Sequence, residues 1–329
     1  MEIYNDSGFK FLHFLWIIIP HIYMLLFGYN TMKKTSWSYI SKSSGLKRNM
    51  TIWSKGDPNN KNVLFVVAGG FTLWMDTYMN IVLADFEKYT DIYKKYNVVV
   101  VEKLDVCNLV MFEDFSQYVK HHDALVGGCE ELVFLGFSSG GVISSHCLAH
   151  LHDLKCKKKI VTYDTPWQVV NNIRSFTLNW FYRIDVWVMY NVVMTAYRNH
   201  YNYDDIKHFV KKKFWFGNGA YELIDIVKNI HGFDDSQLFK NSGFNFDQTH
   251  DTVVINIFSS RDPFHTLSTS GDYIDANKDK IKFKNIFIKM DRTGHCSNMA
   301  FSNKYLNEIY TAICSNFDYE RDILCGFNT

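Results

Sequence analysis

Hydrophobic residues follow two alternating patterns along most of the chain. Short, continuous apolar runs bounded by turn residues are typical of strands buried on both faces of a parallel sheet. Stretches with apolar residues at helical spacing separate these runs. The alternation predicts an α/β protein with a mostly parallel central sheet and helices on both faces. The runs are Val63–Ala68, Val98–Val101, Leu132–Leu135, Ile160–Tyr163, Val253–Phe258 and Ile286–Met290, and the helical stretches are Thr77–Tyr96, Phe112–Val126, Gly141–Leu154 and Ser297–Phe317.

Two further segments complete the predicted organisation. Trp37–Lys42 and Met50–Ser54 alternate apolar and polar residues, with Gly45 between them, which predicts a half-buried hairpin. Residues 167–250 separate two predicted strands and are too long for a plain crossover. We interpret them as a largely helical, apolar cap or lid inserted into a core formed by residues 36–166 and 251–329.

The chain begins with an apolar segment, residues 9–29. Its central part, Phe11–Phe27, has 17 residues without Asp, Glu, Lys or Arg, which is the lower limit for crossing a bilayer. We expect an uncleaved membrane anchor or interfacial helix, and a signal peptide or a buried helix are the alternatives. More lysines follow the segment than precede it, so we expect the remaining chain to lie on the cytosolic side.

Composition limits the possible partners and cofactors. The formal net charge of +1 gives no reason to expect a nucleic-acid partner, and runs such as Lys157–Lys159 are interpreted as solvated ends of elements. The seven cysteines are widely spaced and form no C-x-x-C pair, which favours reduced thiols in a cytosolic setting. His146 and His150 lie four residues apart, but the glutamate of an H-E-x-x-H zinc motif is missing. We expect no metal and no cofactor.

The sequence Gly136-Phe137-Ser138-Ser139-Gly140 carries the clearest chemical signal. It fits the pattern G-x-S-x-G, directly after a predicted strand and before a predicted helix. Such a turn is sharp and strained, and side chains at Gly136 and Gly140 are expected to collide with the neighbouring strand and helix. The turn therefore predicts an exposed nucleophile at Ser138, with the positive end of a helix dipole beneath it.

A second glycine pair follows the first buried strand, in Ala68-Gly69-Gly70-Phe71. A tetrahedral intermediate needs two preorganised N–H donors. We expect the N–H groups of Ser139 and Phe71 to supply them, although a tight turn alone would also require glycine. Gly70, together with Trp167 at the start of the insertion, is expected to border the substrate.

The acid and the base of the predicted site follow later strands. Asp262 comes shortly after Val253–Phe258, and His295 shortly after Ile286–Met290. An imidazole can take the serine proton and return it to the leaving group, while a carboxylate holds its tautomer. Asp164, at the end of the strand before the insertion, is the main alternative acid. Asp291 is a weaker alternative acid, and His265 is the rival base.

These motifs resemble those of the α/β-hydrolase superfamily over roughly Trp37 to Phe317. The matching residues are Gly69-Gly70-Phe71, the turn at Ser138, Asp262 and Gly294-His295, in the order Ser, Asp, His that this fold uses. The superfamily usually has a histidine where Gly69 stands, and the role of Phe71 rests on the resemblance. The resemblance implies hydrolysis of an ester, thioester or amide without a cofactor.

The sequence therefore predicts a serine hydrolase that cleaves a carboxylic ester through an acyl-enzyme intermediate. The apolar insertion and the apolar N-terminal segment favour a lipid or another apolar acyl substrate, met at a membrane. The insertion's aromatic residues also fit a plain hydrophobic core. Two other classes stay open: a non-catalytic binding or receptor protein on this scaffold, and a non-hydrolytic enzyme such as a lyase or haloperoxidase.

Overall fold

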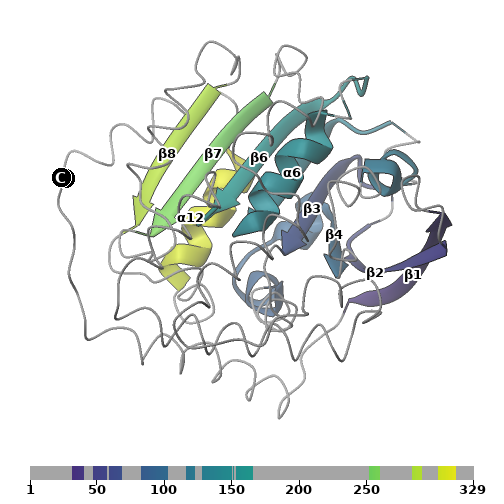
Figure 1. Cartoon of the computed structure of the whole chain (residues 1–329). Coiled ribbons are helices and arrows are strands. Elements are labelled where there is room, and N and C mark those ends of the chain that lie inside the picture. The colour runs from purple at the N-terminus through teal and green to yellow at the C-terminus, as the bar shows by residue number, and fades with distance from the viewer. Residues whose placement is uncertain are drawn as a thin grey trace, which may run out of the picture.

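One sheet organises the part of the chain that the computed structural model describes, residues 32–40, 47–57, 59–68, 83–102, 116–122, 128–149, 151, 153–165, 252–259, 284–290 and 303–315. Within these ranges eight strands pair in the order β1-β2-β4-β3-β5-β6-β7-β8 (Figure 1). The strands are β1 (Lys33–Ile40), β2 (Lys47–Lys55), β3 (Asn62–Ala68), β4 (Asn97–Glu102), β5 (Glu131–Phe137), β6 (Lys157–Tyr163), β7 (Thr252–Ser259) and β8 (Lys284–Met290).

The sheet confirms the predicted fold class. β1 and β2 form the expected antiparallel hairpin, and β2 pairs antiparallel with β4. All other neighbours pair in parallel, from β4 through to β8. Each predicted apolar run lies within one strand. A strand can be apolar at every position only when neither of its faces is exposed to solvent.

Helices cover both faces of this sheet, as predicted. Successive side chains of a strand point to opposite faces. Gly141 of α6 (Ser139–Ala149) lies against Thr162 of β6, whereas Lys159 of β6 donates to the Ile313 carbonyl of α12 (Asn303–Cys314) at 2.7 Å. Positions 159 and 162 differ by an odd number, so α6 and α12 lie on opposite faces (Figure 1).

The helix predicted over Thr77–Tyr96 is interrupted. Residues 83–89 are helical, and α3 (Ile92–Lys95) starts again after Thr90 and Asp91. The Thr90 hydroxyl donates to the Phe86 carbonyl at 2.5 Å and accepts from the Ile92 N–H at 3.3 Å. A threonine side chain that bonds the nearby backbone in this way competes with the regular helical ladder. The spacing of apolar residues continues across the break, and the sequence therefore indicated a single helix.

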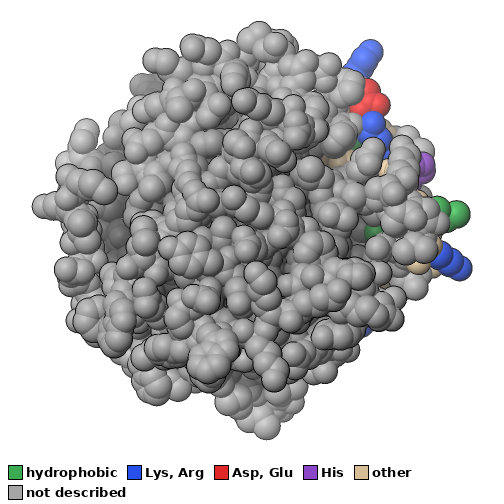
Figure 2. Space-filling model, in the orientation of Figure 1, with side chains coloured by type: hydrophobic (Ala, Val, Ile, Leu, Met, Phe, Trp, Pro, Cys, Tyr) green, Lys and Arg blue, Asp and Glu red, His purple; other side chains and the backbone are tan. Residues whose placement is uncertain are grey.

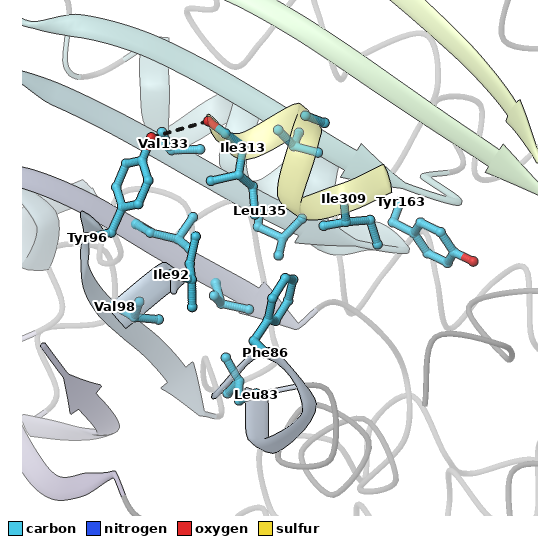
Figure 3. Packing of buried hydrophobic residues seen from close by; sticks show 14 of the residues in the cluster. Leu83, Phe86, Ile92, Tyr96, Val98, Val133, Leu135, Tyr163, Ile309 and Ile313 are labelled. Carbon is cyan, nitrogen blue, oxygen red and sulfur yellow. Dashed lines mark hydrogen bonds between the residues drawn. The ribbon is translucent and has the colours of Figure 1, made fainter. Parts of the chain in front are cut away.

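The hydrophobic core on the α12 face joins the sheet to three helical segments (Figure 3). Residues 83–89, α3 and α12 all bury side chains against strands β3 to β7. Each fully buried aliphatic or phenylalanine side chain contributes about 1.5–3 kcal/mol through the hydrophobic effect. The labelled residues in Figure 3 include Phe86, Ile92, Val98, Val133, Leu135, Tyr163, Ile309 and Ile313.

Polar contacts fix the C-terminal end of α12. Lys159 is fully buried; its ammonium donates to the carbonyls of Ile313 and Ser315 and lies 3.2 Å from a carboxylate oxygen of Glu131. The Tyr96 hydroxyl shares its one hydrogen between Glu131 Oε2 at 2.9 Å and the Ile313 carbonyl at 3.3 Å. The interpretation of Lys157–Lys159 as solvated ends is therefore wrong for Lys158 and Lys159, which are both buried. The charge of Lys159 lies at the C-terminal end of a helix, where it is favourable.

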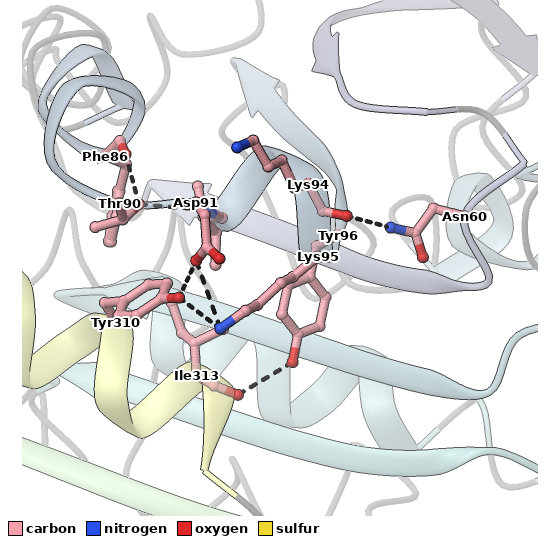
Figure 4. Close-up of polar contacts among 10 residues, drawn as sticks. Asn60, Phe86, Thr90, Asp91, Lys94, Lys95, Tyr96, Tyr310 and Ile313 are labelled. Atoms are coloured by element: carbon pink, nitrogen blue, oxygen red, sulfur yellow. Dashed lines mark hydrogen bonds and ion pairs between the residues drawn. The ribbon is translucent and has the colours of Figure 1, made fainter.

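A second polar cluster ties α3 to α12 at the surface (Figure 4). The Lys95 ammonium donates to the Tyr310 hydroxyl at 2.6 Å and pairs with Asp91 at 3.4 Å. The Tyr310 hydroxyl donates to the Asp91 carboxylate, and this hydrogen bond lowers the pKa of Asp91. The cluster holds the two helices side by side over the core.

Two predicted segments lie outside the described residues: the apolar residues 9–29 and the insertion 167–250. Among the helices that the structure describes, none has the length and apolar character needed to span a bilayer. In the view of Figure 2 the described side chains that can be seen lie along the right-hand edge, the side on which Figure 1 shows β1 and β2. Basic side chains there are interspersed with acidic, histidine and apolar ones.

Candidate active site

Ser138 occupies a sharp turn between β5 and α6. Its φ of 51° lies in the left-handed region, which residues other than glycine rarely adopt. Its N–H donates to the Tyr163 carbonyl of β6 at 2.9 Å, and its carbonyl accepts from the Gly141 N–H at 3.2 Å. The side chain is partly exposed at the carboxyl edge of the sheet. This is the strained strand–turn–helix geometry predicted from the sequence, and such strain is concentrated at functional sites.

Two glycines make this turn possible. A Cβ built at Gly136 would lie 2.5 Å from both the Cα and the N of Gly141, which confirms its predicted role. A Cβ at Gly141 would lie 2.1 Å from Thr165 Oγ1 and 2.9 Å from Thr162 Cγ2. This steric role of Gly141 was not predicted, although the doubled glycine after Ser139 is a signal in the sequence. The role assigned to Gly140 stays a prediction.

Helix α6 places its first turn directly after Ser138. Ser139 is the first residue of the helix, and the first N–H groups of a helix have no partner within it. These groups and the aligned peptide dipoles give the start of α6 a partial positive charge. An anionic oxygen that develops beside Ser138 would therefore lie in a favourable field. The role of the Ser139 N–H as one donor of an oxyanion hole stays a prediction.

Asp164 directly follows β6, just as Ser138 directly follows β5. It has a φ of 49°, its N–H donates to the Ile257 carbonyl of β7 at 2.9 Å, and it is completely buried. Phe137 pairs with Tyr163, so Ser138 and Asp164 follow paired residues of neighbouring strands. A buried aspartate in a strained turn is unusual and points to a specific role. The structure thus places Asp164, the alternative acid, directly after the strand that neighbours the strand leading to Ser138.

The remaining predicted site residues follow described strands in the sequence. Ala68, the last residue of β3, is paired with Phe137, the residue directly before Ser138. β7 and β8 end at Ser259 and Met290 on the same carboxyl edge. Outside the described residues are Gly70, Phe71, Trp167, Asp262 and His295. No group of three potential metal ligands occurs among the residues that the structure describes.

Comparisons with known proteins agree on the architecture. No family model and no curated protein matches the sequence. An esterase of solved structure from Pyrobaculum calidifontis is 10% identical with a TM-score of 0.55, over 95% of this chain and 94% of that one. Carboxyl esterase 2 from Tuber melanosporum is 13% identical with a TM-score of 0.53, over 87% and 89%. An esterase from Pyrococcus furiosus is 11% identical with a TM-score of 0.51, over 86% and 90%. Together with the turn at Ser138, these similarities identify the fold of this chain as the α/β-hydrolase fold.

Proposed function

We propose that the protein is a serine hydrolase that cleaves a carboxylic ester, with Ser138 as nucleophile, His295 as base and Asp262 as acid. The observation that carries the proposal is the strained, partly exposed turn of Ser138 between β5 and α6. Strain of this kind costs free energy. The glycine contacts at positions 136 and 141 show that the surrounding packing is arranged to hold it.

The proposed reaction has two steps. His295 takes the Ser138 proton while Oγ attacks the ester carbonyl carbon. The resulting oxyanion accepts hydrogen bonds from the N–H groups of Ser139 and Phe71. The intermediate collapses, His295 returns the proton to the leaving alcohol, and the acyl group stays on Ser138. His295 then takes a proton from water, which attacks the acyl-enzyme carbonyl, and returns that proton to Ser138 Oγ as the acid is released.

Chain geometry permits His295 to reach Ser138. β8 lies three strands from β5 in the sheet, which corresponds to about 14 Å at the usual spacing of neighbouring strands. His295 is the fifth residue after the last residue of β8, Met290, and five extended residues span up to about 17 Å. A loop that turns back over the carboxyl edge therefore has enough length.

Labelling with a fluorophosphonate tests the nucleophile. Such reagents trap an activated serine covalently, so we expect wild-type protein to be labelled and Ser138→Ala to show none. Ser139→Ala is the matched control, because it keeps the backbone N–H and should still be labelled. Absence of labelling in folded wild-type protein would contradict the proposal and favour a binding or receptor role on this scaffold.

The substrate is proposed to be an ester with a lipid-like or other apolar acyl chain. Support comes from the apolar composition of residues 9–29 and of the insertion, which contains FTLNWFYRIDVWVMYNVVMTAY at Phe176–Tyr197. Membrane attachment through the N-terminal segment would bring such a site to its substrate.

A series of esters with increasing acyl length tests the substrate class. We expect kcat/KM to rise by about tenfold or more from acetyl to octanoyl, because each buried methylene contributes about 0.8 kcal/mol until the pocket is filled. Ser138→Ala, measured in parallel, corrects for spontaneous hydrolysis. A clear preference for acetyl esters would contradict the apolar-substrate proposal and leave the hydrolase proposal intact.

A further inference from the structure

Two cysteines meet at the amino edge of the sheet, the edge opposite Ser138. Cys129 lies two residues before β5, and Cys156 directly precedes β6. Glu131 pairs with Lys157, and the Lys157 N–H donates to the Glu130 carbonyl at 3.1 Å, which continues the parallel ladder by one residue. The two cysteines lie far apart in the sequence, and their spacing gave no indication of this contact.

Their separation suits a disulfide. In the continued register Cys156 is opposite Glu130, so Cys129 is offset from it by one residue. A strand spacing of about 4.8 Å and a rise of about 3.3 Å then place the two Cα atoms about 6 Å apart. Disulfides join Cα atoms that are about 4.4–6.8 Å apart, so this separation is within the range that a disulfide spans. Cys129 lies outside β5, and its side chain does not have to follow the alternation of the strand.

The two thiols are already in contact and differ in chemical character. Both are free and partly exposed. The Cys129 thiol donates a hydrogen bond to the Cys156 sulfur, which lowers the pKa of Cys156, and the nearby Lys158 ammonium acts in the same direction. The same hydrogen bond, together with burial, raises the pKa of Cys129. Cys156 is therefore the better nucleophile and Cys129 the proton donor beside it.

We propose that Cys129 and Cys156 form a redox-sensitive pair that is oxidised to an intramolecular disulfide by small-molecule disulfides. The Cys156 thiolate attacks one sulfur of the small disulfide, breaks its S–S bond and releases one thiol. Cys129 then loses its proton and attacks the Cys156 sulfur of the mixed disulfide, which releases the second thiol. Two protein thiols are oxidised, and one small disulfide is reduced to two thiols.

The disulfide would close a covalent loop that contains Ser138, the proposed nucleophile. The loop from Cys129 to Cys156 contains β5, the turn at Ser138 and α6. A cross-link at the amino edge restricts the unfolded chain while leaving the carboxyl edge untouched. We therefore expect oxidation to raise the melting temperature by about 5 °C for a chain of this length. This inference does not depend on the proposed ester hydrolysis.

Peptide mapping of the full-length protein tests the pair. Reduced protein is incubated with glutathione disulfide, remaining thiols are alkylated, and cysteine peptides are identified by mass spectrometry. We expect a linked peptide pair containing Cys129 and Cys156, together with the rise in melting temperature. Cys129→Ser should accumulate a mixed disulfide at Cys156, whereas Cys129 in Cys156→Ser should react about tenfold more slowly. Cys314→Ser is the control and should still form the link.

Three outcomes would overturn the proposal: both cysteines remaining thiols, either one linking to a different cysteine, or stable mixed disulfides at both positions without a link. Equal reaction rates of the two single variants would overturn the assigned order of attack. The wild-type peptide map decides the pairing even if a serine variant fails to fold.

Discussion

Replacing His295 with alanine is expected to lower ester turnover by about 10⁴-fold, because nothing would then take the proton from Ser138. The loss should fall on kcat rather than on KM, since the imidazole acts on the reacting atoms and not on the acyl chain. Steady-state kinetics on the preferred ester gives the result. His265→Ala is the control, because His265 is the rival base in the sequence, and it should keep near-normal turnover. The reverse pattern would move the base to His265.

The acid can be assigned by the same assay. Asp262→Asn should lower kcat by about 10³–10⁴-fold, because an asparagine cannot hold the imidazole in the required tautomer. Asp164→Asn should retain most of the turnover, with its effect confined to stability. Asp164 is the main alternative acid because it is completely buried and follows β6, the strand that neighbours β5. If Asp164→Asn loses activity and Asp262→Asn keeps it, the carboxylate comes from the end of β6.

Replacing Lys159 with methionine is expected to destabilise the fold by about 3 kcal/mol. Methionine matches the volume of the lysine stem but leaves the Ser315 carbonyl and part of the Glu131 carboxylate without their donor. Burial lowers the pKa of Lys159 while the Glu131 carboxylate opposes this effect. The buried Lys159 thus pairs with a carboxylate that is partly shielded from solvent, and removing the lysine leaves that carboxylate without its positive partner. Urea unfolding followed by tryptophan fluorescence measures the change.

Two further variants distinguish the loss of the Lys159–Glu131 ion pair from a general disruption of β6. Lys157→Met lies on the same strand but at an exposed position, and it should change the free energy of unfolding by less than about 0.5 kcal/mol. Adding Glu131→Gln to Lys159→Met should recover about 1 kcal/mol, because the unpaired carboxylate is then gone. If the double variant is less stable than Lys159→Met, the role assigned to the ion pair is wrong.

Much of the sheet could be predicted from the sequence because parallel strands buried on both faces leave continuous apolar runs. The apolar runs in β3, β4 and β5 could be assigned to strands without knowledge of tertiary contacts. The glycines around Ser138 predicted the turn. These signals are local: each depends on a few consecutive residues and on the backbone conformations that they allow.

The features that escaped prediction depend on packing between distant segments. Lys159 was interpreted as solvated because nothing near it in the sequence indicates that α12 ends above it. The break at Thr90 escaped because the apolar spacing continues through it. Gly141 and Thr165 meet only after β6 has paired beside β5. The choice between Asp262 and Asp164 also depends on which side chain reaches the imidazole, and strand order alone does not decide this.

The close fit between Gly141 and Thr165 limits how this protein could acquire new specificity. A carbon atom added at position 141 would collide with Thr165, so a side chain there would force the start of α6 away from the end of β6. Changes in substrate choice during evolution are therefore expected in the loops rather than at this contact. A library of variants selected for a new ester should leave positions 136, 141 and 165 unaltered.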